Sequence, residues 1–261
     1  MHPELFHIGS FVLPTYGVLL AIGFLLALAL LRKRAPSFGI SPDTASDLGL
    51  WILLAGLVGS KLLLVVVEWP YYVSSFSNFK ELARVAGVFY GGLIGATLAA
   101  VVLIRKKGVS FFAFADAAAP AVLIGQSIGR LGCFSAGCCW GAPTAVPWAV
   151  TFTSEAAHKN VGVPLGVPIH PTQLYESAGT LLLAVLLIAL EKRKWSGQTF
   201  ARYVGGYALL RGTIEFFRGD PRGSVADGLV STSQLIALAG LVLAFGLWYT
   251  RRHRPAVPQT A

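Results

Sequence analysis

Long apolar runs constrain the fold of this chain more than any other feature. The seven runs cover approximately residues 15–31, 46–67, 88–104, 112–129, 172–190, 199–217 and 231–249. Several approach the roughly 20 residues that an α-helix needs to cross a bilayer. Only 13% of the residues are charged, whereas soluble domains carry about 25%. The sequence therefore predicts an all-α integral membrane protein with seven transmembrane helices.

Basic clusters indicate how these helices are oriented. They follow the first, third, fifth and seventh runs, at residues 32–34, 105–107, 192–194 and 251–254. Because short loops rich in Lys and Arg stay cytoplasmic, we expect the N-terminus outside and the C-terminus in the cytoplasm. The net charge of +9 then indicates attraction to anionic headgroups rather than nucleic-acid binding, since the clusters adjoin span ends and lack interleaved aromatic residues.

This orientation makes residues 1–261 a single transmembrane domain whose polar segments gather on one side. Besides the N-terminal arm, the outer-face loops are expected at 68–87, 130–171 and 218–230. A charged residue within a span costs roughly 3 kcal/mol on insertion scales. Charged side chains next to these loops are therefore candidates for pairing, for contact with water or for function.

Arg130 is the first of these candidates. It stands in Gly129-Arg130-Leu131-Gly132 at the outer end of the fourth run. The flanking glycines allow a bend and a close approach of a ligand. The residue alone leaves two interpretations open, an arginine that snorkels to the headgroups and a phosphate-binding group.

A second group of charges lies in "RGTIEFFR" at 211–218. Arg211 and Glu215 are spaced i, i+4, and Arg218 follows three residues later, which on a continuous helix places all three on one face. Two arginines around one carboxylate suit a phosphate or phosphodiester, because guanidinium forms bidentate hydrogen bonds. The alternative is a buried structural ion pair.

The stretch "HPTQLYES" gives the fifth run an unusually polar start. It contains His170, Gln173, Tyr175 and Glu176. Residues 170, 173 and 176 lie near one helix face, which predicts a shared hydrogen-bond network. His170 is either part of a site or a structural histidine.

Two further features have ordinary structural interpretations. Tyr90 precedes Gly91, Gly92 and Gly95, and such glycines favour tight helix packing. The chain's cysteines are Cys133, Cys138 and Cys139, in a C-x4-C-C spacing that differs from paired C-x2-C zinc motifs. With no nearby histidine as a fourth ligand, we expect no metal and interpret them as small packing residues, although the outer face also permits a disulfide.

Together these motifs identify a resemblance that covers essentially the whole chain. The sequence resembles the prolipoprotein diacylglyceryl transferase family of bacterial membrane enzymes. The motifs that carry the resemblance are Tyr16-Gly17, "YGGLIG" at 90–95, "FFAFADAAAP" at 111–120, "GRLG" at 129–132, "HPTQLYE" at 170–176, "RGTIEFFR" at 211–218 and Ser233-Gln234.

The resemblance implies a reaction and its partners. A diacylglyceryl group would pass from phosphatidylglycerol to the lipobox cysteine thiol in the signal peptide of a preprolipoprotein, releasing glycerol phosphate. The expected location is the bacterial cytoplasmic (inner) membrane, among membrane lipids, with no cofactor. Family members have seven spans and an outer N-terminus.

The resemblance also suggests roles for individual residues. The expected catalytic group is Arg130, Arg211, Glu215, Tyr90 and Tyr16, with the two arginines clamping the departing phosphate. The expected substrate-binding residues are His170, Gln173, Tyr175, Glu176, Arg218, Gln234 and Cys133.

This chain departs from the family pattern at three positions. Many members carry histidine where this chain has Tyr90, asparagine where it has Cys133 and glutamate where it has Cys138. The base that activates the thiol thus remains open among Tyr90, His170 and Glu215. Two other functions also remain open: transfer of a lipid moiety to a different acceptor by a paralogue of the same fold, and non-catalytic transport.

Overall fold

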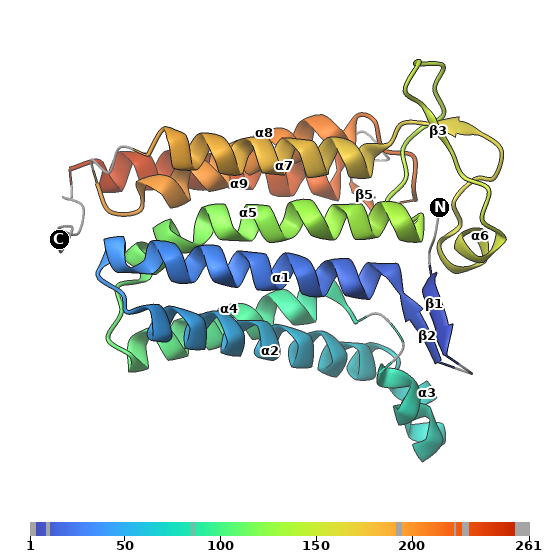
Figure 1. Ribbon diagram of the computed structural model, residues 1–261, viewed down its shortest axis with the longest axis horizontal. Coiled ribbons are helices and arrows are strands. Elements are labelled where there is room, and N and C mark those ends of the chain that lie inside the picture. Colours follow the sequence, from blue (N-terminus) through green and yellow to red (C-terminus); the bar gives the residue numbers. More distant parts are fainter. Residues whose placement is uncertain are drawn as a thin grey trace. The chain divides into compact units, whose positions relative to one another are not determined.

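The computed structural model describes residues 4–8, 11–83, 85, 87–191, 195–221, 223–225 and 230–253. The basic cluster at 192–194, Arg254 and parts of the predicted 68–87 and 218–230 loops lie outside these residues. Long helices dominate the described chain (Figure 1). They are α1 (Thr15–Arg34), α2 (Pro42–Val67), α4 (Phe89–Lys106), α5 (Phe111–Ala136), α7 (Thr172–Ala189), α8 (Gln198–Glu215) and α9 (Thr232–Arg251).

Short elements occupy the polar segments between the long helices. The helical ones are η1 (Ala35–Phe38), α3 (Trp69–Ser74), η2 (Phe76–Ala83) and α6 (Glu155–Val161). The strands are β1 (Glu4–Ile8), β2 (Phe11–Pro14), β3 (Val150–Thr151), β4 (Pro168–Ile169), β5 (Ser224–Val225) and β6 (Val230–Ser231). They form three antiparallel pairs, β1 with β2, β3 with β4 and β5 with β6. The fold is thus mainly helical, with small two-stranded sheets that the apolar pattern did not predict.

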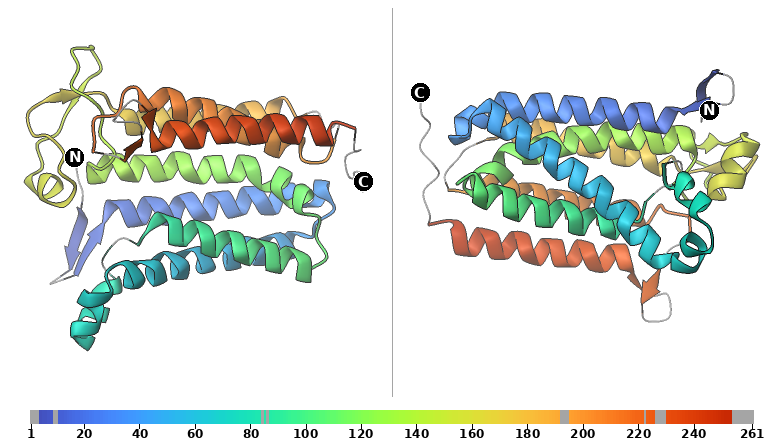
Figure 2. Two further views of the ribbon diagram at one scale, coloured as in Figure 1. Left: turned by 180° about the vertical axis from the view of Figure 1, so that it is seen from behind. Right: turned by 90° about the horizontal axis from the view of Figure 1, so that it is seen from below.

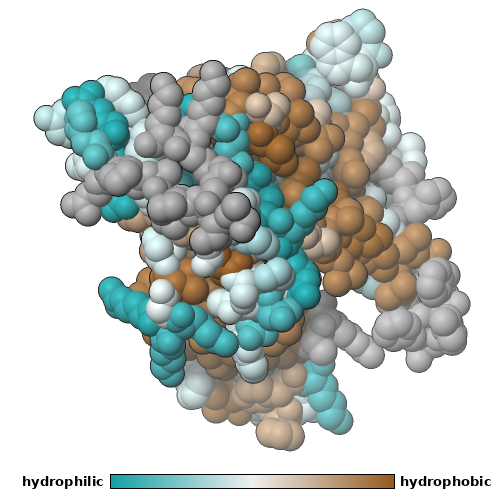
Figure 3. Space-filling view, turned by 60° about the vertical axis from the view of Figure 1, so that its left-hand side comes forward, coloured by the Kyte–Doolittle hydropathy of each residue, from teal (hydrophilic) through white to brown (hydrophobic). Residues whose placement is uncertain are grey.

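The helices support the membrane prediction. Among the described residues, six are long and apolar enough to cross a bilayer: α1 together with η1, α2, α4, α5, α7 and α9. The remaining predicted span, α8, is not among them; it carries Arg202, Arg211 and Glu215. On the face that Figure 3 shows, hydrophilic residues gather in one part and broad hydrophobic areas adjoin them.

The chain divides into two compact units. The second unit contains residues 31–114, and in it α2 packs along α4. A Cβ added to Gly95 would lie 2.5 Å from the carbonyl oxygen of Ala55, and one added to Gly91 would lie 2.5 Å from the Cβ of Leu63. The prediction that these glycines allow tight helix packing is confirmed.

The first unit contains residues 1–30 and 115–258. Here α8 packs against both α7 and α9 (Figures 1 and 2). The hydroxyls of Ser127 on α5 and Ser177 on α7 each donate to the other residue's carbonyl oxygen at 2.9 Å. On another side of α5, a Cβ on Gly23 of α1 would lie 2.9 Å from the carbonyl oxygen of Gly125. Small side chains thus bring α5 close to both α1 and α7.

A buried acid joins α5 to the start of α8. Asp116 accepts hydrogen bonds from the backbone amides of Gly197 (2.7 Å) and Phe200 (2.8 Å). These amides belong to the first turn of α8, where free N–H groups favour a carboxylate. This contact fixes one end of α8, and the residues discussed below lie toward its other end.

Candidate active site

Arg130 of α5 forms a buried ion pair with Glu176 of α7. Its Nη2 lies 2.8 Å from Oε1 of Glu176, and the glutamate side chain is fully buried. Breaking such a pair typically costs 3–5 kcal/mol, because one charge remains buried and uncompensated. Arg130 is therefore paired within the protein, and Glu176 fixes the orientation of its guanidinium group.

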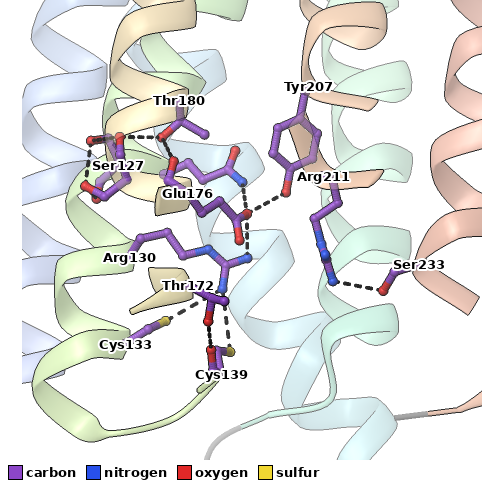
Figure 4. Close-up of polar contacts among 12 residues, drawn as sticks. Ser127, Arg130, Cys133, Cys139, Thr172, Glu176, Thr180, Tyr207, Arg211 and Ser233 are labelled. Atoms are coloured by element: carbon purple, nitrogen blue, oxygen red, sulfur yellow. Dashed lines mark hydrogen bonds and ion pairs between the residues drawn. The ribbon is translucent and has the colours of Figure 1, made fainter. Parts of the chain in front are cut away.

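Two more side chains converge on the same carboxylate oxygen (Figure 4). The hydroxyl of Tyr207 on α8 donates to Oε1 of Glu176 at 3.0 Å, and Nε2 of Gln126 on α5 donates at 3.2 Å. The other oxygen of Glu176, Oε2, is buried without a hydrogen-bond partner among the described residues. The cluster thus ties three helices together and leaves one buried acceptor available.

Arg211 of α8 forms the second ion pair. Its Nη1 lies 2.6 Å from Oε2 of Glu215, so the predicted i, i+4 pair is confirmed. Its Nη2 donates to the hydroxyl of Ser233 in the first turn of α9 at 2.9 Å. In Figure 4, Arg130 on α5 is directed toward Glu176, and Arg211 on α8 is directed toward Ser233. Each arginine is oriented by its own partners.

Arg218 lies apart from this pair, contrary to the expectation of one shared helix face. Because α8 ends at Glu215, Arg218 follows the helix and pairs with Asp220 through two hydrogen bonds of 2.8 and 2.7 Å. Burial alone would lower the pKa of Arg218, but the bonds to Asp220 outweigh it and raise that pKa. Its Nη1 is buried without a hydrogen-bond partner among the described residues.

His170, Gln173 and Glu176 make separate contacts instead of the predicted shared network. Nδ1 of His170 lies 3.1 Å from the hydroxyl oxygen of Tyr175. This hydroxyl oxygen accepts a hydrogen bond from Nε1 of Trp148 at 2.7 Å. The rings of His170 and Tyr175 both pack against Phe217. His170 precedes α7, so its side chain does not share the helical spacing of the other two.

The polar start of α7 instead holds the turn that follows α5. Nε2 of Gln173 donates to the carbonyl oxygen of Cys138 at 2.7 Å. The hydroxyl of Thr172 donates to the carbonyl oxygen of Cys139 at 2.8 Å. Cys139 has a φ of 63°, the left-handed conformation that is uncommon outside glycine. Gln173 is thus a positioning residue for this turn.

The turn brings three sulfur atoms together. The Sγ atoms of Cys133, Cys138 and Cys139 all lie within 4.8 Å of one another, and none is in a disulfide. Hydrogen bonding to the other two thiols, together with the positive charge of Arg218, lowers the pKa of Cys139. Hydrogen bonding and burial raise the pKa of Cys138. The cluster therefore places three interacting thiols in one turn.

Three predicted residues occupy other settings. Tyr16 of α1 packs on the segment that carries Arg130, since a Cβ on Gly132 would lie 3.1 Å from its ring. Gln234 forms a capping box with Ser231 at the start of α9, which accounts for this residue without a ligand. Tyr90 is exposed and belongs to the second unit.

Sequence reasoning missed Tyr207, Gln126 and Asp220. Tyr207 stands one turn before Arg211 on α8, and Gln126 stands one turn before Arg130 on α5. A polar side chain one helical turn from an intramembrane arginine is a usable signal, because residues i and i+4 lie on one face. Asp220 has no such signal. The apolar run predicts a helix to residue 217, but α8 ends at Glu215, so Arg218 turns toward Asp220 instead of continuing the helix face.

The helices and this cluster define a polytopic membrane protein with one buried arginine–glutamate pair between two helices and a second within α8. The sequence model of prolipoprotein diacylglyceryl transferases matches residues 3–250. The chain therefore belongs to this family.

Several similar proteins are named as members of this family. The phosphatidylglycerol–prolipoprotein diacylglyceryl transferase of Clostridium tetani is 34% identical over 255 residues, which cover 97% of this chain and 99% of the relative. That of Acaryochloris marina is 34% identical over 99% of this chain and 94% of its own length. An enzyme of Clostridium perfringens, named as the second such transferase, is 32% identical over 87% of each chain.

Proposed function

We propose that this protein transfers a diacylglyceryl group from phosphatidylglycerol to the lipobox cysteine of a preprolipoprotein in the bacterial inner membrane. The carrying observation is the pair of oriented arginines, Arg130 and Arg211, on α5 and α8 of a family fold. In the reaction, the cysteine sulfur bonds to the glyceryl carbon, the C–O bond to phosphate breaks, and the electron pair leaves with glycerol phosphate. The developing negative charge is therefore on the phosphate.

The arginines suit this charge because their geometry is fixed in advance. Glu176 and Glu215 each occupy one edge of a guanidinium, and a guanidinium has five N–H donors. We assign the N–H donors that these partners leave unused to the developing charge, because preorganised donors stabilise a transition state most effectively. The buried Oε2 of Glu176 offers an acceptor for a substrate hydroxyl.

For the membrane topology we propose seven spans, with the N-terminus outside. The last turns of α1, α4 and α9 carry basic residues, as cytoplasmic ends do. If α7 and α9 both run toward the cytoplasm, the chain between them returns across the bilayer as α8. Its 18 residues extend about 27 Å, close to the hydrocarbon thickness of about 30 Å.

The charges of α8 are compatible with a membrane-spanning position. Arg211 and Glu215 neutralise each other, and Arg202 donates to the carbonyl oxygen of Leu190 at 3.0 Å. Charges inside membranes are tolerated when they pair or face the bundle interior. Cysteine accessibility at single engineered sites on either side of α8 would test this topology.

The test of the function compares arginine variants in reconstituted vesicles. Wild-type protein, Arg130→Lys and Arg211→Lys receive labelled phosphatidylglycerol and a lipobox peptide, and the thioether product is measured. Because lysine keeps the charge but loses the planar fork, we expect activity to fall about 10²–10³-fold, the usual effect of losing a preorganised donor. Arg202→Lys is the matched control on the same helix, with unchanged activity expected.

Each result has a defined meaning. Wild-type protein without thioether product would contradict the proposed function. Activity that survives in both Arg130→Lys and Arg211→Lys would contradict the phosphate clamp while leaving the function intact. Tyr90→Phe distinguishes a catalytic role of Tyr90 from a packing role. Loss of activity with the amount of folded protein unchanged would assign its hydroxyl to the reaction.

A further inference from the structure

The three thiols of Cys133, Cys138 and Cys139, here called the thiol triad, form a cluster that the phosphate clamp does not use. Cys133 lies in the last turn of α5, and the other two follow Gly137 in the turn after the helix. All three are free and only partly buried. Their sulfur atoms lie within 4.8 Å of one another, so a single ion fits among them.

The turn is constructed so that these sulfurs converge. Gly137 has a φ of 78°, and Cys139 adopts a φ of 63°, a conformation that costs an ordinary residue roughly 1–2 kcal/mol. Buried side chains of α7, Gln173 and Thr172, hold the carbonyl oxygens of Cys138 and Cys139. Packing alone requires small residues here, but it does not require three sulfurs directed to one point.

The donor set matches zinc in number and in chemistry. Thiolates favour Zn²⁺ and Cu⁺ over hard cations, and catalytic zinc sites have three protein ligands and an open fourth position. With Zn–S bonds of about 2.3 Å, tetrahedral geometry separates the sulfurs by about 3.8 Å. Small χ1 rotations of the cysteines close the remaining difference from the 4.8 Å limit.

Arg130 supplies the surroundings that such a site needs. Its Nη1 lies 3.6 Å from Sγ of Cys139 and 4.0 Å from Sγ of Cys133, as Figure 4 shows. Three thiolates around a divalent ion leave one net negative charge, and N–H donors to the sulfurs stabilise it. The same guanidinium therefore connects the thiol triad to the proposed phosphate site.

We propose that the thiol triad binds Zn²⁺ and that the open fourth position takes the cysteine thiol of the peptide substrate. This inference rests on the proposed function. Among the described residues, no fourth His, Cys, Asp or Glu side chain joins the three sulfurs, so the metal would have one open position. One substrate sulfur would fill this position and lose its proton there.

The group-transfer step balances with this ion in place. A thiol that coordinates zinc loses its proton, which passes to solvent, and the thiolate is the nucleophile. Its sulfur bonds to the glyceryl carbon as the C–O bond to phosphate breaks, and the electron pair leaves on glycerol phosphate. The thioether product is a weaker ligand than the thiolate and leaves the metal, so the site is regenerated without an oxidant or reductant.

Metal content tests the binding step directly. Full-length protein is purified in detergent under thiol-reducing conditions, exposed to Zn²⁺, desalted and analysed by mass spectrometry. We expect about one zinc per chain, as for a single three-ligand site, and at least a five-fold lower content in Cys133→Ser, Cys138→Ser and Cys139→Ser. Ser135→Ala is the matched control, since Ser135 lies in the same turn of α5 and, among the described residues, its hydroxyl bonds only to the carbonyl oxygen of Leu131; its zinc content should equal the wild type.

Cobalt substitution tests the fourth ligand. The Co²⁺-loaded protein should show thiolate-to-cobalt charge-transfer absorption, which increases when a lipobox peptide is added. The same peptide with serine in place of cysteine should leave the spectrum unchanged. An equal response to both peptides would overturn the coordination of substrate.

Three outcomes overturn the proposal at different points. Wild-type protein that retains no zinc, or that contains a disulfide within the thiol triad after isolation from the membrane, would overturn the metal site. Chelation that removes the zinc without lowering lipidation would overturn thiol activation. Zinc binding in a protein that never lipidates the peptide would refute the proposed function while the metal site stands.

Discussion

The α2–α4 crossing and the α5–α7 crossing both bring two helices into close contact, but with different side chains. The first depends on glycines, at which a Cβ would meet backbone atoms or Leu63 of the other helix. The second places Ser127 against Ser177 and buries a pair between Glu176, the residue before Ser177 on α7, and Arg130, one turn after Ser127 on α5. Both solutions allow close packing in lipid. The second also retains a buried ion pair that close packing does not require, and the proposed function uses this pair.

The largest expected effect on stability is at the α5–α7 crossing, which holds the Arg130–Glu176 pair. Glu176→Ala leaves Arg130 buried without its counter-charge, so we expect the free energy of unfolding to fall by about 3–5 kcal/mol. Chemical denaturation in detergent measures this change. Glu176→Gln is the control, since it keeps the volume and one hydrogen-bond acceptor and should lose less. Equal stability of the alanine variant and the wild type would show that the pair has no structural part.

Tyr207→Phe sharpens the comparison within the same crossing. It removes one hydrogen bond to the Glu176 carboxylate, and hydrogen bonds to charged groups contribute about 1.5–3 kcal/mol. Tyr203→Phe serves as the matched control, because Tyr203 stacks on Tyr207 and its hydroxyl makes no hydrogen bond among the described residues. If both variants lose the same stability in denaturation, the aromatic stack matters rather than the bond to Glu176.

At the glycine crossing, Gly95→Ala tests whether close approach is required. The new Cβ would lie 2.5 Å from the carbonyl oxygen of Ala55, and backbone cannot easily give way. Overpacking of this kind costs about 1–3 kcal/mol, which thermal unfolding in detergent would detect. Gly56→Ala is the control on the partner helix, where the nearest atoms lie 3.4 Å away. A similar unfolding temperature for the two variants would argue against a tight α2–α4 contact.

The smallest effect is expected at the start of α9. Gln234→Ala opens the capping box with Ser231 and should cost about 0.3–1.5 kcal/mol, with lipidation per folded molecule unchanged. Gln234→Glu preserves the box and is the control. A loss of lipidation in Gln234→Ala at normal stability would instead assign this side chain to the substrate.

The sequence predicted what depends on local spacing. The Arg211–Glu215 pair follows from i, i+4 geometry, and the glycine packing of α4 follows from small residues that recur on one side of a helix. The Arg130–Glu176 pair did not follow, because it joins two helices whose contact no local pattern encodes. The convergence of the cysteines depends on two left-handed residues, Gly137 and Cys139, and linear spacing cannot reveal such a turn.

The short stretch after the cysteine turn links the two polar helix ends mechanically. The amide of Ala142 donates to the carbonyl oxygen of Phe217, the carbonyl oxygen of Ala142 accepts from the amide of His170, and the amide of Gly219 donates to Trp140. Gly141 lies so close to His170 that a Cβ there would approach that residue's Cβ to 2.7 Å. These backbone bonds join the residues that follow α8 and those that precede α7 to the segment just after the cysteines, so we expect a tilt of either helix end to shift the sulfurs.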